Sequence, residues 1–126
     1  MKVSFDSLIP VYVQIAEAIE ADIISGKLPE GGPAYSQLII ARELNVNPAT
    51  AAKGINMLVS KGILEKQRGS SMAVAAGALD RLLKERRDDG FRGLINNLVS
   101  EAKKINLSED DVIDWIKKRY RDTEEI

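Results

Sequence analysis

The first part of the chain carries an apolar stripe at helical spacing. From Pro10 to Ser25, apolar residues recur every three or four positions and the acidic residues fall between them, which predicts an amphipathic helix. Pro10 suits the first turn, because its missing N–H has no helical partner there, and Gly26 suits the left-handed conformation that ends a helix. The stripe comprises Tyr12, Ile15, Ala16, Ile19 and Ile23.

A short helix is predicted over residues 37–44, after a connector at residues 28–34 that is rich in Gly and Pro. Ser36 stands at its N-cap position, where a hydroxyl accepts a hydrogen bond from a free backbone N–H. Ile40 and Leu44 fall one turn apart on the inward face of this helix. A tight turn is expected directly after it.

A third helix begins with the strongest start signal in the chain. Asn47 is suited to accept hydrogen bonds from free N–H groups, and Pro48 at the first helical position presets φ. The helix is expected to run to Lys61 and to stop at Gly62. Its outward face has little bulk near the N-terminus, so it can enter a DNA major groove, which is about 12 Å wide. That face comprises Ala49, Thr50, Lys53, Asn56 and Ser60.

The hydrophobic period then changes from helical to strand-like. Residues 63–67 and 72–75 are short strand-like segments, and the polar residues between them include Gly69. This arrangement predicts a β-hairpin. The order of helix, short helix, tight turn, capped helix and hairpin is that of a winged helix-turn-helix. We therefore predict a mainly α fold with a small β-hairpin wing over residues 1–76.

Residues 77–126 predict a helical tail. Gly90 and Gly93 indicate a kink or break after a first helix, and Ser108 with Asp111 forms a capping-box-like start for the last one. Two amphipathic helices of this size do not bury their apolar faces alone. They pack either on the N-terminal domain or against the same helices of a second chain. Their apolar positions include Leu79, Leu82, Leu83, Leu94, Leu98, Val99, Ile105, Val112, Trp115 and Ile116.

The composition excludes several classes of function. The chain of 126 residues has no Cys and no His, which rules out disulfides, thiolate metal sites and a Cys nucleophile, and removes the commonest general base. The carboxylate pairs at residues 88–89 and 110–111 lie in a predicted polar break and at a helix start, where solvation and capping explain them. We expect no enzymatic activity, no metal and no cofactor. No segment predicts a signal peptide or a membrane span, so a cytoplasmic protein is expected.

The net charge of −1 conceals an uneven distribution of charge. Residues 1–33 sum to −3, residues 34–71 to +3 and residues 72–126 to −1. The positive segment coincides with the helix-turn-helix and the wing. A basic segment on such a unit favours a nucleic-acid partner if its residues converge in space.

Four short motifs occur in order along this part of the chain. They are Pro10-x-Tyr12-x-Gln14-Ile15, Gly26-x-Leu28-x-x-Gly31, Val46-Asn47-Pro48-x-Thr50, and Gly62 with Arg68-Gly69. Through these motifs residues 5–77 resemble the GntR family of bacterial transcriptional regulators. The Asn-Pro-x-Thr form is similar to the YtrA-type subfamily, whose members pair this domain with a short two-helix tail. One departure is Leu38, which stands where the family commonly has an Arg that contacts DNA.

The resemblance implies a sequence-specific DNA-binding transcriptional regulator that acts as a repressor. It also implies a homodimer that meets through the apolar tail positions and binds a pseudo-palindromic operator, with half-sites roughly 34 Å apart. The expected partners are therefore double-stranded DNA and a second copy of the chain, with an unidentified small-molecule effector left open. The residues expected to contact DNA are Tyr35, Ser36, Gln37, Asn47, Ala49, Thr50, Lys53, Asn56, Arg68, Gly69 and Ser70.

Several alternatives stay open at the level of single residues and of the whole domain. Ser36 and Asn47 serve either as helix caps alone or as caps that also contact DNA. Lys53 is expected to contact a phosphate or a base, and Arg68 to contact DNA from the hairpin tip. For the domain, the alternative is a winged-helix module that binds protein rather than DNA, since the positive charge is modest.

Overall fold

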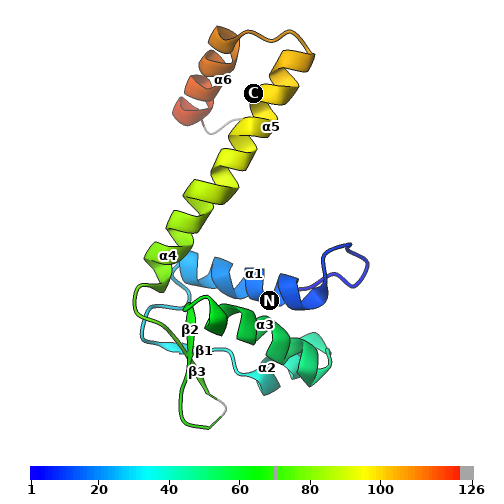
Figure 1. Ribbon diagram of the computed structural model, residues 1–126, viewed down its shortest axis with the longest axis vertical. Helices are drawn as coiled ribbons and strands as arrows, with labels where there is room; N and C mark the ends of the chain where they lie inside the picture. The colour runs from blue at the N-terminus through cyan, green and yellow to red at the C-terminus, as the bar shows by residue number, and fades with distance from the viewer. Residues whose placement is uncertain (70, 123–126) are drawn as a thin grey trace. The chain divides into compact units, whose positions relative to one another are not determined.

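The structure is a computed structural model that describes residues 1–69 and 71–122. The chain forms two compact units, Met1–Glu85 and Arg86–Ile126. In order along the chain, the described helices and strands of the first unit are α1 (Val11–Ile24), β1 (Pro33–Ala34), α2 (Gln37–Leu44), α3 (Pro48–Ser60), β2 (Leu64–Lys66), β3 (Met72–Val74) and α4 (Ala78–Glu85) (Figure 1).

The strands form an antiparallel sheet with β3 in the middle. β2 and β3 make the predicted hairpin, in which Leu64 lies opposite Val74. β1 is an addition to the prediction, because Pro33 and Ala34 lie in the predicted connector and pair with β3. Two residues, one of them a proline, carry no alternation of apolar and polar positions, so the sequence pattern does not reveal this strand.

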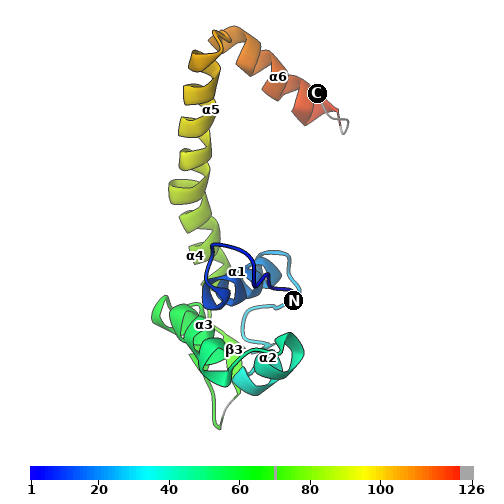
Figure 2. The same cartoon turned by 90° about the vertical axis from the view of Figure 1, so that its right-hand side faces the viewer.

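The core of the first unit forms where α1 packs along α3, as both views of the ribbon show (Figures 1 and 2). Gly54 of α3 allows this close approach, because a Cβ at that position would lie 2.8 Å from the carbonyl oxygen of Tyr12 in α1. The largest fully buried side chains are Ile15, Ile19, Ile40, Leu58, Ile63, Leu64, Leu82 and Val74. The predicted winged helix-turn-helix fold, mainly α with a β-hairpin wing, is thus confirmed.

The first compact unit extends beyond the predicted boundary at residue 76 and takes in α4. Ala78 is fully buried and Leu82 is 1% exposed, and both belong to the core cluster. The backbone N–H of Leu79 donates to Oε1 of Glu30 at 3.1 Å. Leu82 therefore lies in the core of its own domain, where it is not accessible to a second chain. Leu82 was wrongly predicted as a dimer contact, because the three leucines of α4 share one apolar face in the sequence pattern.

The second unit begins with a π-helical segment, η1 (Arg86–Phe91), followed by α5 (Arg92–Lys104) and α6 (Glu109–Arg121). The interruption predicted at Gly90 is a π-helical widening rather than a stop. The predicted cap of α6 is confirmed, since the Ser108 hydroxyl accepts a hydrogen bond from the N–H of Asp111 at 3.1 Å. Acidic residues in the first turn of α6 and basic residues in its last turn complement the helix dipole.

The described part of the chain lacks two features. No described helix is both long and apolar enough to cross a membrane. Among the same residues, no group of three or more Asp and Glu side chains is placed to hold a metal ion.

Candidate nucleic-acid interface

α3 presents the outward face that the sequence predicts. Its inner side packs into the core through Ala51, Gly54, Ile55 and Leu58. Its outer side exposes Ala49, Lys53, Asn56 and Ser60, with Thr50 half-buried at the edge. Since these side chains are small, polar or basic, nothing bulky keeps the helix out of a groove of DNA.

The N-termini of α2 and α3 are both closed by the predicted caps. Oδ1 of Asn47 accepts a hydrogen bond from the N–H of Ala49 at 2.8 Å, and the Ser36 hydroxyl accepts one from the N–H of Ile39 at 3.2 Å. The capping roles are therefore confirmed. The positive end of a helix dipole also favours a phosphate beside each cap.

Gln37 ties these two helix N-termini together. Its Nε2 donates to the carbonyl oxygen of Pro48 at 3.1 Å. The turn between the helices is short, with Asn45 in the left-handed conformation at a φ of 53°, and the N–H of Val46 donates to the carbonyl oxygen of Ala41. The cross-link and the turn fix the spacing of the two helix starts.

A polar hollow of about 240 Å³ lies between α3 and the hairpin. It brings together Gln37, Asn56 and Gly69, which are expected DNA contacts from three separate elements. It also adds Lys66, a cation of β2 that is not among those expected contacts. The lining residues are Gln37, Ala52, Ile55, Asn56, Lys66, Gly69 and Met72.

The hairpin carries Arg68 at its exposed tip. The N–H of Gln67 donates to the carbonyl oxygen of Ser71 at 3.0 Å. The Ser71 hydroxyl donates to the carbonyl oxygen of Arg68 at 3.0 Å. Gly69 has a φ of 73°, in the left-handed region that favours glycine. Ser70 lies outside the described residues. The hydrogen bonds fix the backbone around Arg68 and leave its guanidinium facing solvent.

Tyr35, an expected DNA contact, has a partner inside the domain. Its hydroxyl donates to Oδ2 of Asp22 in α1 at 2.6 Å. This hydrogen bond, the partial burial of the ring and the negative charge of Asp22 raise the pKa of Tyr35. The hydroxyl therefore binds the segment just before α2 to α1 instead of pointing freely at DNA. No local pattern reveals this, because the two residues belong to different segments.

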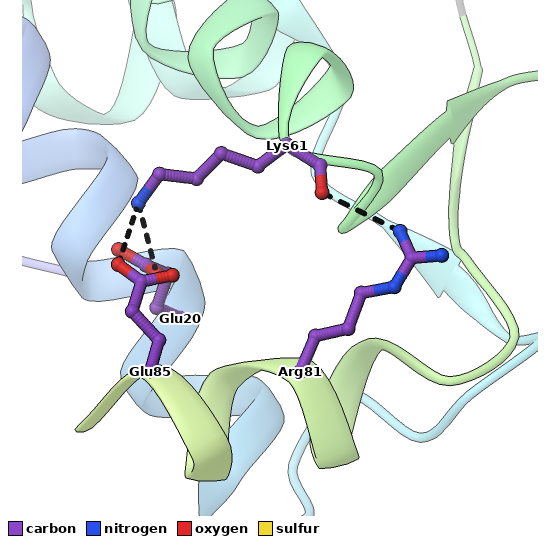
Figure 3. Close-up of polar contacts among 4 residues, drawn as sticks. All are labelled: Glu20, Lys61, Arg81 and Glu85. Carbon is purple, nitrogen blue, oxygen red and sulfur yellow. Dashed lines mark hydrogen bonds and ion pairs between the residues drawn. The ribbon is translucent and has the colours of Figure 1, made fainter. Parts of the chain in front are cut away.

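Lys61 does not contribute to the positive surface that the net charge of residues 34–71 suggests. Its Nζ lies 3.1 Å from Oε1 of Glu85 and 3.8 Å from Oε2 of Glu20 (Figure 3). Burial lowers the pKa of Lys61, but the hydrogen bond to Glu85 and the negative charge of both carboxylates outweigh burial and raise it. This cation is thus neutralised within the domain. The other basic residues of the segment 34–71 are exposed, and they are Arg42, Lys53, Lys66 and Arg68.

Arg81 fastens α4 to the end of α3. Its Nη1 donates to the carbonyl oxygen of Gly62 at 3.2 Å. The same atom donates to the carbonyl oxygen of Lys61 at 3.5 Å (Figure 3). The last carbonyls of a helix have no helical donor, so an arginine here satisfies them and complements the dipole. The end of α3 and α4 are therefore bonded to one another within the first unit.

In the second unit, α5 and α6 leave an apolar hollow of about 600 Å³. Among the predicted dimer positions, Leu94 is 63% exposed and Trp115 is 45% exposed, whereas Val112 is half-buried. In α4, Leu83 is exposed and Leu79 is half-buried. The hollow is lined by Leu98, Glu101, Ala102, Ile105, Leu107, Val112, Trp115, Ile116, Arg119 and Tyr120.

Comparison with known proteins decides the family. The family of bacterial regulatory proteins called gntR matches residues 11–74, which run from the first residue of α1 to the last of β3. The chain belongs to the GntR family. This GntR-family chain is a DNA-binding transcriptional regulator, and the alternative of a winged-helix module that binds only protein is set aside. The family consists of transcriptional regulators rather than enzymes.

Similarity to individual proteins extends over the tail as well. YhcF of Bacillus subtilis, an uncharacterized HTH-type transcriptional regulator, is 27% identical over 113 residues, which cover 90% of this chain and 92% of YhcF. A GntR family transcriptional regulator from Listeria monocytogenes is 28% identical with a TM-score of 0.71, covering 90% of this chain and 98% of that one. YtrA from Sulfolobus acidocaldarius is 28% identical with a TM-score of 0.57, covering 96% and 97%. This GntR-family chain thus resembles the YtrA type.

Proposed function

We propose that this GntR-family regulator binds a pseudo-palindromic operator as a homodimer and represses transcription there. The observation that carries the binding mode is the meeting of Gln37, Asn56 and Lys66 around the hollow beside the exposed side of α3. In this mode α3 enters the major groove with Asn56 toward the base edges. Arg68 at the hairpin tip reaches the adjacent phosphates or minor groove.

The phosphate contacts come mainly from the two capped helix starts. Backbone N–H groups next to Ser36 and Asn47 bind phosphate oxygens, and the Thr50 hydroxyl supports the second of these contacts. Lys66 joins the set from the hairpin. The proposed DNA-contacting residues are Ser36, Gln37, Asn47, Ala49, Thr50, Lys53, Asn56, Lys66, Arg68, Gly69 and Ser70.

The proposed homodimer is supported by the apolar surface of the second unit. The hollow between α5 and α6 is lined largely by apolar side chains, and contiguous apolar surface of this kind marks an interaction site. A two-fold dimer presents two copies of α3 to two half-sites. The proposed interface residues are Leu79, Leu83, Leu94, Leu98, Val99, Ile105, Val112, Trp115 and Ile116.

Repression follows if the dimer covers a promoter that RNA polymerase must occupy. The similarity of this chain to HTH-type transcriptional repressors, among them NagR of Bacillus subtilis, supports this mode. Because bacterial DNA lies in the cytoplasm, the proposed function places the protein there.

The test is selection of duplexes from a random-sequence pool by the full-length protein. We expect a recovered site with two related half-sites. Asn56→Ala should then cost about 1–3 kcal/mol on the preferred base and relax the sequence preference at one position per half-site. Arg68→Ala should weaken binding of all duplexes alike. Neither variant should lower the melting temperature much, and Lys84→Met on α4 is the matched control. Recovery of no site at low salt would contradict the proposal.

A further inference from the structure

Tyr12 and Lys53 meet across the boundary between α1 and α3. The Nζ atom of Lys53 lies 4.0 Å from the centroid of the Tyr12 ring. Tyr12 stands in the first turn of α1, and Lys53 stands on the exposed side of α3. A cation over the face of an aromatic ring is attracted by the negative charge of that face. The ring therefore gives the lysine side chain a preferred position.

The backbone that carries the ring is held close to α3. Gly54 follows Lys53 in α3, and a Cβ there would lie 2.8 Å from the carbonyl oxygen of Tyr12. The two helices thus approach each other closely beside this pair, which fixes the backbone of Tyr12 relative to α3. Lys53 is drawn to the side of α3 that faces α1, whereas Asn56 stays on the exposed side of α3 at the edge of the hollow.

We propose that Tyr12 is a positioning residue that holds the Lys53 ammonium on the α1 side of α3, where it binds a DNA backbone phosphate. This rests on the proposed entry of α3 into the major groove. A helix in that groove turns the centre of its exposed side to the base edges and its two flanks to the phosphates. Lys53 then contributes affinity on every sequence, and Asn56 contributes preference.

The chemistry of the pair suits this role. The ring face attracts the ammonium without accepting a strong hydrogen bond, so the N–H donors that point away from the ring stay available to phosphate oxygens. Holding a flexible lysine in place before binding also reduces the conformational entropy that is lost on binding.

The experiment compares variants on two duplexes, one recovered by the wild-type protein from a random-sequence pool and one unrelated duplex, across a range of salt concentrations. Lys53→Met should weaken binding to both duplexes by the same factor and lower the salt dependence by about one phosphate for each protomer. Tyr12→Leu should weaken binding about two- to five-fold for each protomer with the salt dependence retained, and Tyr12→Phe should restore it. In the Lys53→Met background, Tyr12→Leu should have no further effect.

A series of fluorinated phenylalanines at position 12 keeps the test decisive if Tyr12→Leu fails to fold. Fluorine withdraws electron density from the ring face and preserves the ring shape, so affinity for both duplexes should fall stepwise along the series while the melting temperature stays constant. Two results would show that Tyr12 is only a packing residue and would overturn the proposal. One is an equal loss of affinity on Tyr12→Leu in the wild-type and Lys53→Met backgrounds. The other is an affinity that shows no trend along the series of fluorinated phenylalanines.

Two further outcomes would also overturn it. A loss on Lys53→Met that is confined to the selected duplex would assign Lys53 to a base edge. A gain in affinity on Tyr12→Leu would show that the ring competes with DNA for the ammonium. Failure of the wild-type protein to select any duplex is a separate result, because it rejects DNA binding by α3 itself.

Discussion

Arg81 in α4 donates a hydrogen bond from Nη1 to the carbonyl oxygen of Gly62, just after the end of α3, at 3.2 Å. The neighbouring Lys61 binds α4 twice, because its carbonyl oxygen accepts from Arg81 and its ammonium binds Glu85. α4 thus binds both the backbone at the end of α3 and the side chain of Lys61. α4 is therefore part of the scaffold that orients α3.

Gly62→Ala should lower the stability of the first unit for two reasons. Gly62 has a φ of 75°, and an added Cβ would meet the Arg81 guanidinium. The left-handed conformation alone costs an alanine about 1–2 kcal/mol, and displacement of Arg81 adds to it. Urea unfolding measures the loss. Gly69→Ala is the matched control, because Gly69 has a φ of 73° with open space around it. Equal losses for the two variants would show that the contact with Arg81 contributes nothing.

Gly54→Ala should destabilise the protein by about 1–3 kcal/mol, because overpacking at this crossing forces α1 away from α3. The new Cβ would lie 2.8 Å from the backbone oxygen of Tyr12 and 3.0 Å from Cγ2 of Ile15. Thermal unfolding checks the prediction. Gly93→Ala in α5 is the opposite control, since nothing lies within 4 Å of that site and alanine is the better helix former by roughly 1 kcal/mol. A stable Gly54→Ala protein would refute the close crossing.

Stability should fall at alkaline pH through Tyr35 and Lys61. Both pKa values are raised in the folded protein, from ordinary values of 10.0 and 10.5. The folded state therefore holds these protons more tightly than the unfolded chain does. The stabilisation is present below the ordinary values and is lost as pH rises through the raised ones. Urea unfolding from neutral to alkaline pH should show a shallower decline for Tyr35→Phe and for Lys61→Met than for the wild type.

A carboxylate placed in the apolar hollow of the second unit should prevent dimerisation. Leu98→Glu or Ile116→Glu would bury a charge at the proposed interface, which costs about 3 kcal/mol or more and raises the dimer dissociation constant more than about 100-fold. Sedimentation measures the oligomeric state, and Trp115, the single Trp of the chain, reports association by fluorescence. Ser100→Glu, at an exposed position off the apolar stripe of α5, should leave the dimer intact. A dimeric Leu98→Glu protein would place the interface elsewhere.

The features that are written in local sequence could be predicted. The caps Ser36, Asn47 and Ser108 lie next to the N–H groups that they satisfy, so a stretch of a few residues contains the whole interaction. The same holds for the glycine that ends α3 and for the hairpin around Gly69. These elements were enough to specify the winged helix-turn-helix order and the face of α3.

The features that depend on distant partners could not be predicted. Tyr35 is bound to Asp22, and Lys61 lies between Glu20 and Glu85, so a residue that looks free in the sequence is engaged in the fold. Leu82 shares an apolar stripe with exposed residues, and only the packing of α4 against the core separates it from them. Charge sums and periodicity count residues along the chain and carry no information about which segments meet.

β1 pairs with β3 and so fixes the base of the hairpin that forms the wing. The N–H of Gly31 donates to the carbonyl oxygen of Val74 at 2.8 Å, and the N–H of Val74 donates to that of Gly32 at 3.0 Å. The connector after α1 and the hairpin after α3 are therefore parts of one sheet, and a change in length at this base would break its register. The hairpin tip is free of that constraint. Insertions and deletions in descendants of this protein should accumulate at the tip, where they alter the reach of the wing along DNA and leave the fold intact.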